Sequence, residues 1–592
     1  MPSLHWQGKE KVINHHLEVP FRVLEHQYGF NNGKQTKTET HIGNKIIHGD
    51  NLEALKALLP EYEGQIKCIY IDPPYNTGVE KWVFNDNVNH PKIKKWLGEV
   101  VKDEDEDFSR HDKWLCMMYP RLSLLKKLLD NDGVILISID DNELNNLLTI
   151  CNEIFGRKNF VTTLVWEKKK KGTHLDKKRI SIKEYIVVYC KDHESFSGLI
   201  GEIQTETETY PCINPGNSRS TKIIRKGTKS NFKEKNHVLK TGSKISSGNM
   251  YLELLSDLSI VNGILEADVI IDAEWRYTQE NLDIFKERGE LYFTRDLYLR
   301  RIVNDIRYKK LKDLLLRVDY EEIATIKDQL ISELLNDEHD DDFIKNMLER
   351  INHLENLHFT VVEDVKNLNT GGWGSNEDGD AEIREIFGRK IFDFPKPSKL
   401  LVKLFIATRF REGVFLDSFS GTGTTAHALL KLNKIDGGNR NFILVEMEDY
   451  SETITAERVK RVIKGYGETE GTVGSFDYYE LGENLFQEDG NLNESVGIEK
   501  IRNYIYYSLT KSPLKILAHK DNKYFLNKHN DTAYYFFYEP KKLTTLNHKF
   551  LSSIKTKADQ YVIYADNCLL TKEYMLKHNI IFKKNPRDIT RF

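Results

Sequence analysis

Several features are missing from this sequence of 592 residues, and each absence excludes a class of protein. The six cysteines include no Cys-x-x-Cys pair, which argues against a structural zinc site or a disulfide framework and fits a reducing compartment. The histidines near the N-terminus have no cluster of cysteines or carboxylates beside them, so no metal site is expected. No apolar run approaches the length that spans a bilayer, so we expect a cytoplasmic protein without a membrane segment. No Gly-x4-Gly-Lys-Ser/Thr loop occurs, so the chain carries no ATP-driven motor of its own.

The charge balance is also close to neutral. The net charge is −4 and the pI is 6.6, whereas chains that bind nucleic acid are often strongly basic, so only local basic patches could support such a partner. The composition, 39% hydrophobic and 30% charged, is typical of a soluble globular protein, and the length suffices for about three or four domains. Apolar runs of strand length alternate with helical patterns, which predicts an α/β fold whose mostly parallel sheet has helices on both faces.

The first candidate site follows a predicted buried strand at 66–71, which ends at Asp72-Pro73-Pro74-Tyr75. Proline has no N–H and a fixed φ, so the strand cannot continue, and the stiff backbone leaves its carbonyl groups free to face a ligand. A carboxylate, rigid carbonyl groups and an aromatic ring can grip a planar amine, because the oxygens accept its N–H hydrogens while the ring stacks on its face. The simpler interpretation is a strand that ends in a Pro-Pro turn.

The second candidate site lies where a predicted strand at 413–417 turns into a helix. The turn contains glycines, which let the backbone approach a ligand closely, and it ends at a helix N-terminus, which favours negative charge. The next strand, at 442–445, ends at Glu446, and an acid in this place suits the two hydroxyls of a ribose. Gly-x-Gly after a strand also occurs in NAD- and FAD-binding proteins, but Ala426 stands where that fingerprint has its third glycine.

Asp72-Pro73-Pro74-Tyr75 and Phe419-x-Gly421-x-Gly423 together resemble the motifs of amino-group DNA methyltransferases, which methylate adenine N6 or cytosine N4. The catalytic motif comes first and a domain-sized insertion separates it from the glycines, an order that resembles the β class. The flanks Asp-Pro-Pro-Tyr-Asn-Thr-Gly at 72–78 and Ile-Ser-Ile-Asp-Asp-Asn-Glu at 137–143 are most similar to the modification subunits of Type III restriction-modification systems. The resemblance covers most of residues 40–470.

This resemblance implies a doubly wound methyltransferase sheet in which the strand ending at Ser418 lies beside the strand ending at Asp72. It also implies S-adenosylmethionine as cofactor and site-specific methyl transfer to adenine N6 in double-stranded DNA by base flipping. The catalytic residues carried over are Asp72, Pro73, Pro74 and Tyr75. The cofactor-binding residues carried over are Asp50, Asp72, Lys396, Asp417, Phe419, Gly421, Gly423, Thr424 and Glu446.

Other functions stay open at this point. Aspartate as the first motif letter is usual for adenine enzymes, but cytosine N4 remains an alternative target. A catalytically inactive DNA-binding specificity subunit is an alternative from another class, and it would bind DNA without the cofactor. The resemblance further implies a homodimer and a separate ATP-dependent restriction subunit as partners.

The predicted organisation has five parts, and DNA contacts are expected from two of them. The parts are an N-terminal arm (1–40), the catalytic half of the core (41–199), a turn-rich, basic target-recognition domain (200–390), the cofactor half of the core (391–474) and a small α+β C-terminal module (475–592). Phosphate contacts are expected from a lysine-rich loop and from cations of the insertion. These residues are Lys168, Lys169, Lys170, Lys171, Lys177, Lys178, Arg219, Arg225, Lys226 and Arg276. The lysine run is equally compatible with a solvated loop.

Overall fold

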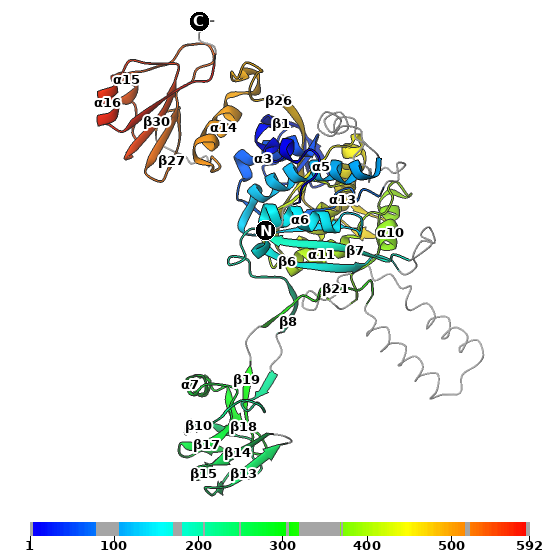
Figure 1. Cartoon of the computed structure of the whole chain (residues 1–592), viewed down its shortest axis with the longest axis vertical. Helices are drawn as coiled ribbons and strands as arrows, with labels where there is room; N and C mark the ends of the chain where they lie inside the picture. The colour runs from blue at the N-terminus through cyan, green and yellow to red at the C-terminus, as the bar shows by residue number, and fades with distance from the viewer. Residues whose placement is uncertain are drawn as a thin grey trace, which may run out of the picture. The chain divides into compact units, whose positions relative to one another are not determined.

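A computed structural model describes residues 4–77, 106–169, 180–204, 208–247, 250–303, 307–318, 368, 371–514 and 521–587 of the chain (Figure 1). The chain divides into two compact units. The core unit comprises Met1–Gly201 and Lys310–Phe592, and the inserted unit comprises Glu202–Lys309. No helix among the described residues is both long enough and apolar enough to cross a membrane.

An eleven-stranded sheet runs through the core unit. Its strands from β26 to β5 are all parallel, and β7 then pairs antiparallel with both β5 and β6. The strand order is β2 (Lys34–Thr36), β1 (Arg22–Asn31), β26 (Ser475–Asn484), β3 (Lys45–His48), β23 (Asn439–Glu446), β22 (Glu412–Asp417), β4 (Ile66–Ile71), β5 (Leu129–Ile139), β7 (Lys183–Cys190), β6 (Phe160–Glu167) and β21 (Leu314–Leu315).

The sheet is buried on both faces, as its nearly continuous apolar strands predict. Successive residues of β4 show this, because Cys68 and Tyr70 belong to one hydrophobic cluster while Ile69 and Ile71 belong to the other. The helices α3 (Asn51–Tyr62), α5 (Glu106–Leu128) and α6 (Leu144–Phe155) contribute to the cluster around Ile69. The helices α11 (Ser398–Ala407), α12 (Thr424–Asp436) and α13 (Glu457–Lys464) contribute to the cluster around Tyr70.

The winding of the sheet reverses between β22 and β4. These neighbours are parallel, with Leu416 opposite Ile69, although 300 or more residues separate them in the chain. From β4 the chain continues through α5 to β5 on one side, and from β22 it continues through α12 to β23 on the other. The predicted doubly wound α/β fold is therefore confirmed, including the predicted neighbourhood of these two strands. Ligands of such sheets bind outside the carboxyl ends of the strands at this point.

Strands from both ends of the chain extend the sheet. Strand β1 lies within the predicted N-terminal arm, and it pairs antiparallel with β26, which begins the predicted C-terminal module. The rest of that module contains α14 (Ile498–Thr510) and a four-stranded sheet, and it has a mixed α+β composition as predicted. The strand order in this sheet is β27 (Phe525–His529), β28 (Thr532–Phe536), β30 (Gln560–Ala565) and β32 (Ile580–Lys584).

The inserted unit has its own hydrophobic core, built on two sheets and the helix α7 (Gln279–Glu287). The four-stranded sheet has the order β10 (Arg219–Ile224), β17 (Val269–Glu274), β14 (Met250–Leu254) and β13 (Lys244–Ser247). The seven-stranded sheet has the order β12 (His237–Leu239), β15 (Leu258–Val261), β16 (Ile264–Leu265), β11 (Lys229–Ser230), β18 (Leu291–Phe293), β19 (Leu299–Val303) and β9 (Glu208–Pro211). Helix α10 (Asn376–Phe387) lies within the predicted insertion of 200–390 but belongs to the core unit.

Candidate functional site

Acidic residues stand at the carboxyl ends of five neighbouring parallel strands. Asp72 follows β4, Asp140 follows β5, Asp417 ends β22, Glu446 ends β23, and Asp50 lies just beyond β3. Because parallel strands share one edge, these acids collect at the same edge of the sheet.

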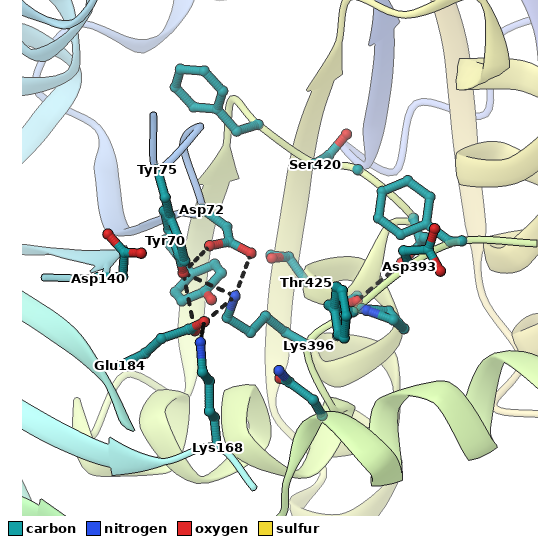
Figure 2. Close-up of a pocket in the computed structure, with 18 of the residues that line it drawn as sticks. Tyr70, Asp72, Tyr75, Asp140, Lys168, Glu184, Asp393, Lys396, Ser420 and Thr425 are labelled. Carbon is teal, nitrogen blue, oxygen red and sulfur yellow. Dashed lines mark hydrogen bonds and ion pairs between the residues drawn. The ribbon is translucent and has the colours of Figure 1, made fainter. Parts of the chain in front are cut away.

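A cavity of about 490 Å³ opens at this edge where the winding reverses (Figure 2). Tyr75 and Gly421 both line it, so the two candidate sites read from the sequence meet in one cavity. Its other predicted members are Asp72, Lys168, Lys169, Lys396, Asp417, Phe419 and Thr424. Phe392, Phe394 and Asn376 also line it, and no sequence signal singled them out.

Asp72, Tyr75 and Lys396 form one hydrogen-bonded group in the cavity, as Figure 2 shows. The Lys396 ammonium donates to Asp72 Oδ2 at 2.8 Å and to the Tyr75 hydroxyl at 3.0 Å, and that hydroxyl donates to Asp72 Oδ1 at 2.8 Å. Burial acts to lower the pKa of Lys396, but the carboxylates of Asp72 and Glu184 outweigh it and raise this pKa above its ordinary value. The lysine therefore stays protonated, and it contacts two residues of the Asp72-Pro73-Pro74-Tyr75 motif.

Glu184, at the start of β7, is a member of this group that the sequence did not identify. Its side chain is buried, and its carboxylate lies 3.3 Å from Lys396 Nζ and 2.8 Å from Lys168 Nζ. Burial acts to raise the pKa of Glu184, but the two ammonium groups outweigh it and lower this pKa below its usual value. A lone acid at the head of an apolar strand was the only signal that could have identified it. Lys168, expected to contact DNA, is bound here to Glu184.

A second buried acid holds the chain just after the motif. Glu143 Oε1 accepts hydrogen bonds from Asn76 Nδ2 at 2.5 Å and contacts His111 Nδ1 at 2.6 Å. The neighbouring carbonyl of Pro74 accepts from the indole N–H of Trp114 at 2.7 Å. Asn76 and Glu143 belong to the two flanks that carried the family resemblance, and their contact gives a physical reason why these segments occur together.

The glycine turn between β22 and α12 favours glycine at both of its glycine positions. Gly421 has a φ of 49° and Gly423 a φ of 81°, in the left-handed region that side chains disfavour. The Gly423 N–H donates to the Ser420 carbonyl at 2.7 Å, which closes the turn. Gly423 is the N-cap residue of α12 and, unlike Gly421, does not line the cavity.

The acids behind this turn are bound by the turn and by nearby backbone N–H groups. Asp417 accepts from the Thr425 hydroxyl at 2.5 Å and from the Phe419 N–H at 3.0 Å. Glu446 accepts from the backbone N–H groups of Gly421, Met447 and Glu448 and does not line the cavity. Burial raises the pKa of Asp417 to about 7 and that of Glu446 to about 8, so part of each population is protonated near neutral pH.

Asp50 is the N-cap of α3. Its carboxylate accepts hydrogen bonds from the backbone N–H groups of Leu52 and Glu53, and it lies 3.5 Å from the guanidinium of Arg121. These contacts fit the ordinary capping role that a Gly-Asp pair has at a helix start. A role of Asp50 or Glu446 in cofactor binding stays a prediction.

A buried arginine that the sequence did not identify ties the turn to the segment of Lys396. Arg458 on α13 donates at 2.7 Å to both hydroxyls of Thr422 and Thr424, and at 2.8 Å to Glu382 on α10. Glu382 in turn accepts from the hydroxyl and N–H of Ser398, two residues after Lys396. The glycine turn and the Pro-Lys-Pro segment, which is Pro395-Lys396-Pro397, are thus held by one network.

The remaining predicted DNA contacts differ in their surroundings. Lys170, Lys171, Lys177 and Lys178 lie outside the described residues. In the inserted unit, Arg219 pairs with Asp272 at 2.8 Å, and Arg225 pairs with Asp283 at 2.9 Å and with Asp268 at 3.1 Å. Lys226 is exposed, and the Arg276 guanidinium lies 5.9 Å from the ring of Tyr210.

Comparisons with known proteins identify relatives of this chain. It is 31% identical over 415 residues to the Type III restriction-modification enzyme StyLTI Mod subunit of Salmonella typhimurium, a match that covers 68% of this chain and 52% of the relative. It is 28% identical over 464 residues to the EcoP15I Mod subunit of Escherichia coli, covering 76% and 64%, respectively. It is also 28% identical over 407 residues to the Type II methyltransferase M.KpnI of Klebsiella pneumoniae, covering 68% and 80%. The chain therefore spans between half and two thirds of the length of these Mod subunits.

The family comparison covers both halves of the core. The N6_N4_Mtase family model, described as DNA methylase, matches residues 66–508, which include the Asp72-Pro73-Pro74-Tyr75 motif, the inserted unit and the glycine turn. Three quarters of the sequence thus matches one family, in the region that builds the cavity. The chain belongs to the DNA methylase family.

Proposed function

We propose that this chain transfers a methyl group from S-adenosylmethionine to adenine N6 in a specific double-stranded DNA sequence, as the modification subunit of a Type III restriction-modification system. The observation that carries the proposal is the single cavity lined by Asp72 and Tyr75 on one side and by Phe419 and Gly421 on the other. An acceptor for an amine and a turn that can cradle a cofactor are thereby placed within reach of one another.

The cofactor half of the cavity fits S-adenosylmethionine. Ser420 lines the cavity, and its buried hydroxyl has no hydrogen-bond partner among the described residues, so a bound ligand could satisfy it. Phe419, Gly421 and Thr424 would surround the cofactor, and Asp417 would support the turn from behind. When bound, the cofactor supplies an electrophilic methyl group.

The catalytic half offers what a flipped adenine needs. The N6 atom cannot be reached inside a stacked duplex, so the base would enter the cavity out of the helix. Tyr75 would stack on its face, while Asp72 and the Pro73 carbonyl would accept its two N–H hydrogens. These hydrogen bonds draw the nitrogen lone pair out of the ring and orient it, so catalysis would rest on positioning and electrostatics rather than on an enzyme nucleophile.

The Lys396 ammonium occupies the Asp72 carboxylate, which the amine would use, and it also contacts the hydroxyl of Tyr75, whose ring would stack on the base. It lies 2.8 Å from Asp72 and 3.0 Å from the Tyr75 hydroxyl, and its third partner, Glu184, is 3.3 Å away. Entry of the base would therefore require Lys396 to move toward Glu184, which keeps its charge paired. Lys396 is accordingly assigned to the cofactor and base cavity, with Glu184 as its counter-ion.

A separate ATP-dependent restriction subunit is proposed as a partner, because relatives are Mod subunits of Type III restriction-modification enzymes and the sequence has no Gly-x4-Gly-Lys-Ser/Thr loop of its own. A homodimer is proposed from the family resemblance alone. A methyltransferase that acts without a restriction partner is the second candidate, favoured by the match that covers 80% of M.KpnI. Cytosine N4 remains the alternative target.

The deciding experiment is incubation of unmethylated DNA with the purified chain and S-adenosylmethionine, digestion to nucleosides and identification of the modified base. N6-methyladenine is expected, and N4-methylcytosine would replace the adenine assignment. Asp72→Ala is the matched control and should give neither product. DNA binding without cofactor and without methyl transfer would instead support a catalytically inactive specificity subunit.

A further inference from the structure

The inserted unit has nearly as many acidic as basic residues, and many of its cations are bound by acids. Besides Arg219 and Arg225, Lys240 pairs with Asp257 at 2.8 Å and Arg301 pairs with Glu290 at 2.8 Å. A cation that is paired with an acid attracts a phosphate only weakly, because the acid cancels most of its electrostatic field. The total charge of the unit therefore does not locate a DNA-binding face, and the unpaired cations must be found individually.

One groove of this unit, which we call the basic groove, collects cations without acids. Its volume is about 860 Å³. It is lined by Lys229, Ser230, Asn231, Phe232, Lys233, Lys235, Asn262, Gly263, Ile264, Tyr292, Thr294 and Arg295, and no aspartate or glutamate is among them. All four cations are exposed, and none forms an ion pair with a residue that the structure describes. Glu234, the acid within the same loop, is bound to His237 at 2.8 Å.

The fold fixes the floor of the basic groove. Strand β11 pairs with β16 on one side and with β18 on the other, so that Lys229 lies opposite both Ile264 and Tyr292. The Ser230 N–H donates to the Gly263 carbonyl at 2.8 Å, and the Gly263 N–H donates to the Lys235 carbonyl at 2.9 Å. The loop that carries Lys233 and Lys235 is thereby anchored to the β15–β16 turn.

The lining also offers neutral donors between the cations. The amides of Asn231 and Asn262 and the hydroxyl of Thr294 can each donate a hydrogen bond to an anionic oxygen. Side chains of this kind, with lysine and arginine, make most protein contacts to DNA phosphates. The ring of Phe232 packs against that of His237, with 4.6 Å between their centroids, and so forms a wall of the groove.

From these observations we infer that the basic groove binds the phosphate backbone of duplex DNA and sets the register of the inserted unit on it. The inference rests on the proposed function for its ligand, and it assigns the contacts to Lys229, Lys233, Lys235 and Arg295 in place of the paired Arg219 and Arg225. Neutralising each phosphate releases condensed counterions, so the slope of log K against log salt concentration becomes more negative by about 0.9 for each true phosphate contact.

The test compares two triple variants of the full chain that remove the same charge from the same unit. The groove variant is Lys229→Ala with Lys233→Ala and Lys235→Ala. The control variant is Lys240→Ala with Lys244→Ala and Lys309→Ala, three exposed lysines that pair with Asp257, Glu253 and Glu202. Dissociation constants for a mixed-sequence duplex are measured across a salt series, which needs no knowledge of the recognition sequence. Circular dichroism and thermal unfolding check that both variants fold like the natural chain.

In the groove variant, the slope of log K against log salt concentration should become smaller in magnitude by about two to three. Its affinity for DNA near 0.1 M salt should fall on the order of a hundredfold. The control variant should keep the slope of the natural chain within about half a unit. Equal losses in the two variants, or none in either, would overturn the inference. If the natural chain methylates DNA while the variants behave alike, the groove assignment fails and the proposed function stands. If the natural chain transfers no methyl group but the slopes differ as expected, the proposed function fails and the groove stands.

Discussion

The ammonium of Lys396 lies 2.8 Å from the carboxylate of Asp72, although 324 residues separate them in the chain. The contact joins the proline-stiffened end of β4 to the Pro-Lys-Pro segment before α11. The same lysine reaches Tyr75 and Glu184, so the charge of the cavity is balanced by groups from three distant segments. The Asp72-Pro73-Pro74-Tyr75 motif is therefore held by tertiary contacts as much as by its own prolines.

Asp72→Ala should abolish methyl transfer while cofactor binding survives. The carboxylate is the proposed acceptor for the target amine, and loss of one preorganised hydrogen-bonding group that stabilises a transition state costs about 10²–10³-fold in rate where the group is a donor in an oxyanion hole. Methyl transfer to DNA and calorimetric binding of S-adenosylmethionine are the two measurements. Retained turnover in this variant would refute the role assigned to Asp72.

Lys396→Met should destabilise the core unit. The double variant, Lys396→Met with Glu184→Gln, should lose less stability than the sum of the losses of the two single variants. Removal of the buried ammonium takes one positively charged partner from each of the Glu184 and Asp72 carboxylates. Breaking a buried ion pair costs about 3–5 kcal/mol. The double variant removes one of the stranded charges, so part of the loss should return. Urea unfolding of the four proteins in the cycle gives the coupling energy. Losses that simply add would show that Lys396 and Glu184 do not interact.

Asp417→Asn should change how the stability of the core unit depends on pH. Burial raises the pKa of Asp417 to about 7, so the folded state holds a proton that the unfolded state loses near pH 4. The contribution of Asp417 to the stability of the natural chain is therefore expected to fall as pH rises from about 4 to about 7, by an amount on the order of 2–4 kcal/mol, and to stay level above that range. Asparagine does not titrate, can donate to Thr425 and can accept from Phe419 N–H.

The advantage of Asp417→Asn over the natural chain should accordingly grow between pH 4 and pH 7. Thermal unfolding midpoints of the two proteins at matched pH values measure it. Glu446 is present in both proteins, so its own titration cancels in the comparison. Parallel pH profiles of the two proteins would contradict the raised pKa of Asp417.

Gly423→Ala should weaken both folding and cofactor binding, whereas Gly437→Ala should affect folding only slightly. Both glycines flank α12 at positive φ, 81° and 67°. A Cβ at Gly423 would lie 3.2 Å from the Thr455 carbonyl oxygen, while a Cβ at Gly437 would meet nothing within 4 Å. We expect about 1 kcal/mol of backbone strain at Gly437 and a larger cost at Gly423, where the turn must also shift.

The free energy of unfolding and the cofactor affinity are measured for both glycine variants. Comparison of the two variants separates the effect of backbone strain from that of the close contact at Gly423. Equal losses of cofactor affinity at the two positions would show that the turn does not depend on close packing at Gly423. Because Gly423 lies outside the cavity lining, any loss of affinity there reports distortion of the neighbouring Gly421 and Ser420.

Local sequence signals predicted the strand that ends at Asp72 and the turn through Gly421 and Gly423, because each depends on backbone limits that proline and glycine impose on their own residues. The family resemblance added the neighbourhood of β22 and β4, which the structure confirms. Neither the local signals nor the family resemblance identified Glu184 or Arg458. Each contributes through partners on other elements, Lys396 for one and Thr422 and Thr424 for the other, and no local pattern marks such partners.

The assignment of cations shows the same division. Sequence alone placed Arg219 and Arg225 in a basic segment, but the structure pairs both with acids from strands or helices at a distance in the chain. Lys168, which was expected from the lysine run to contact DNA, is bound to Glu184 beside the cavity. The amino-acid sequence by itself determined where strands end, which turns need glycine and which residue types the cavity would contain. Only the tertiary structure decided which charges are neutralised and which remain available, because electrostatic interaction depends on separation in space and on burial, and neither quantity follows from position along the chain.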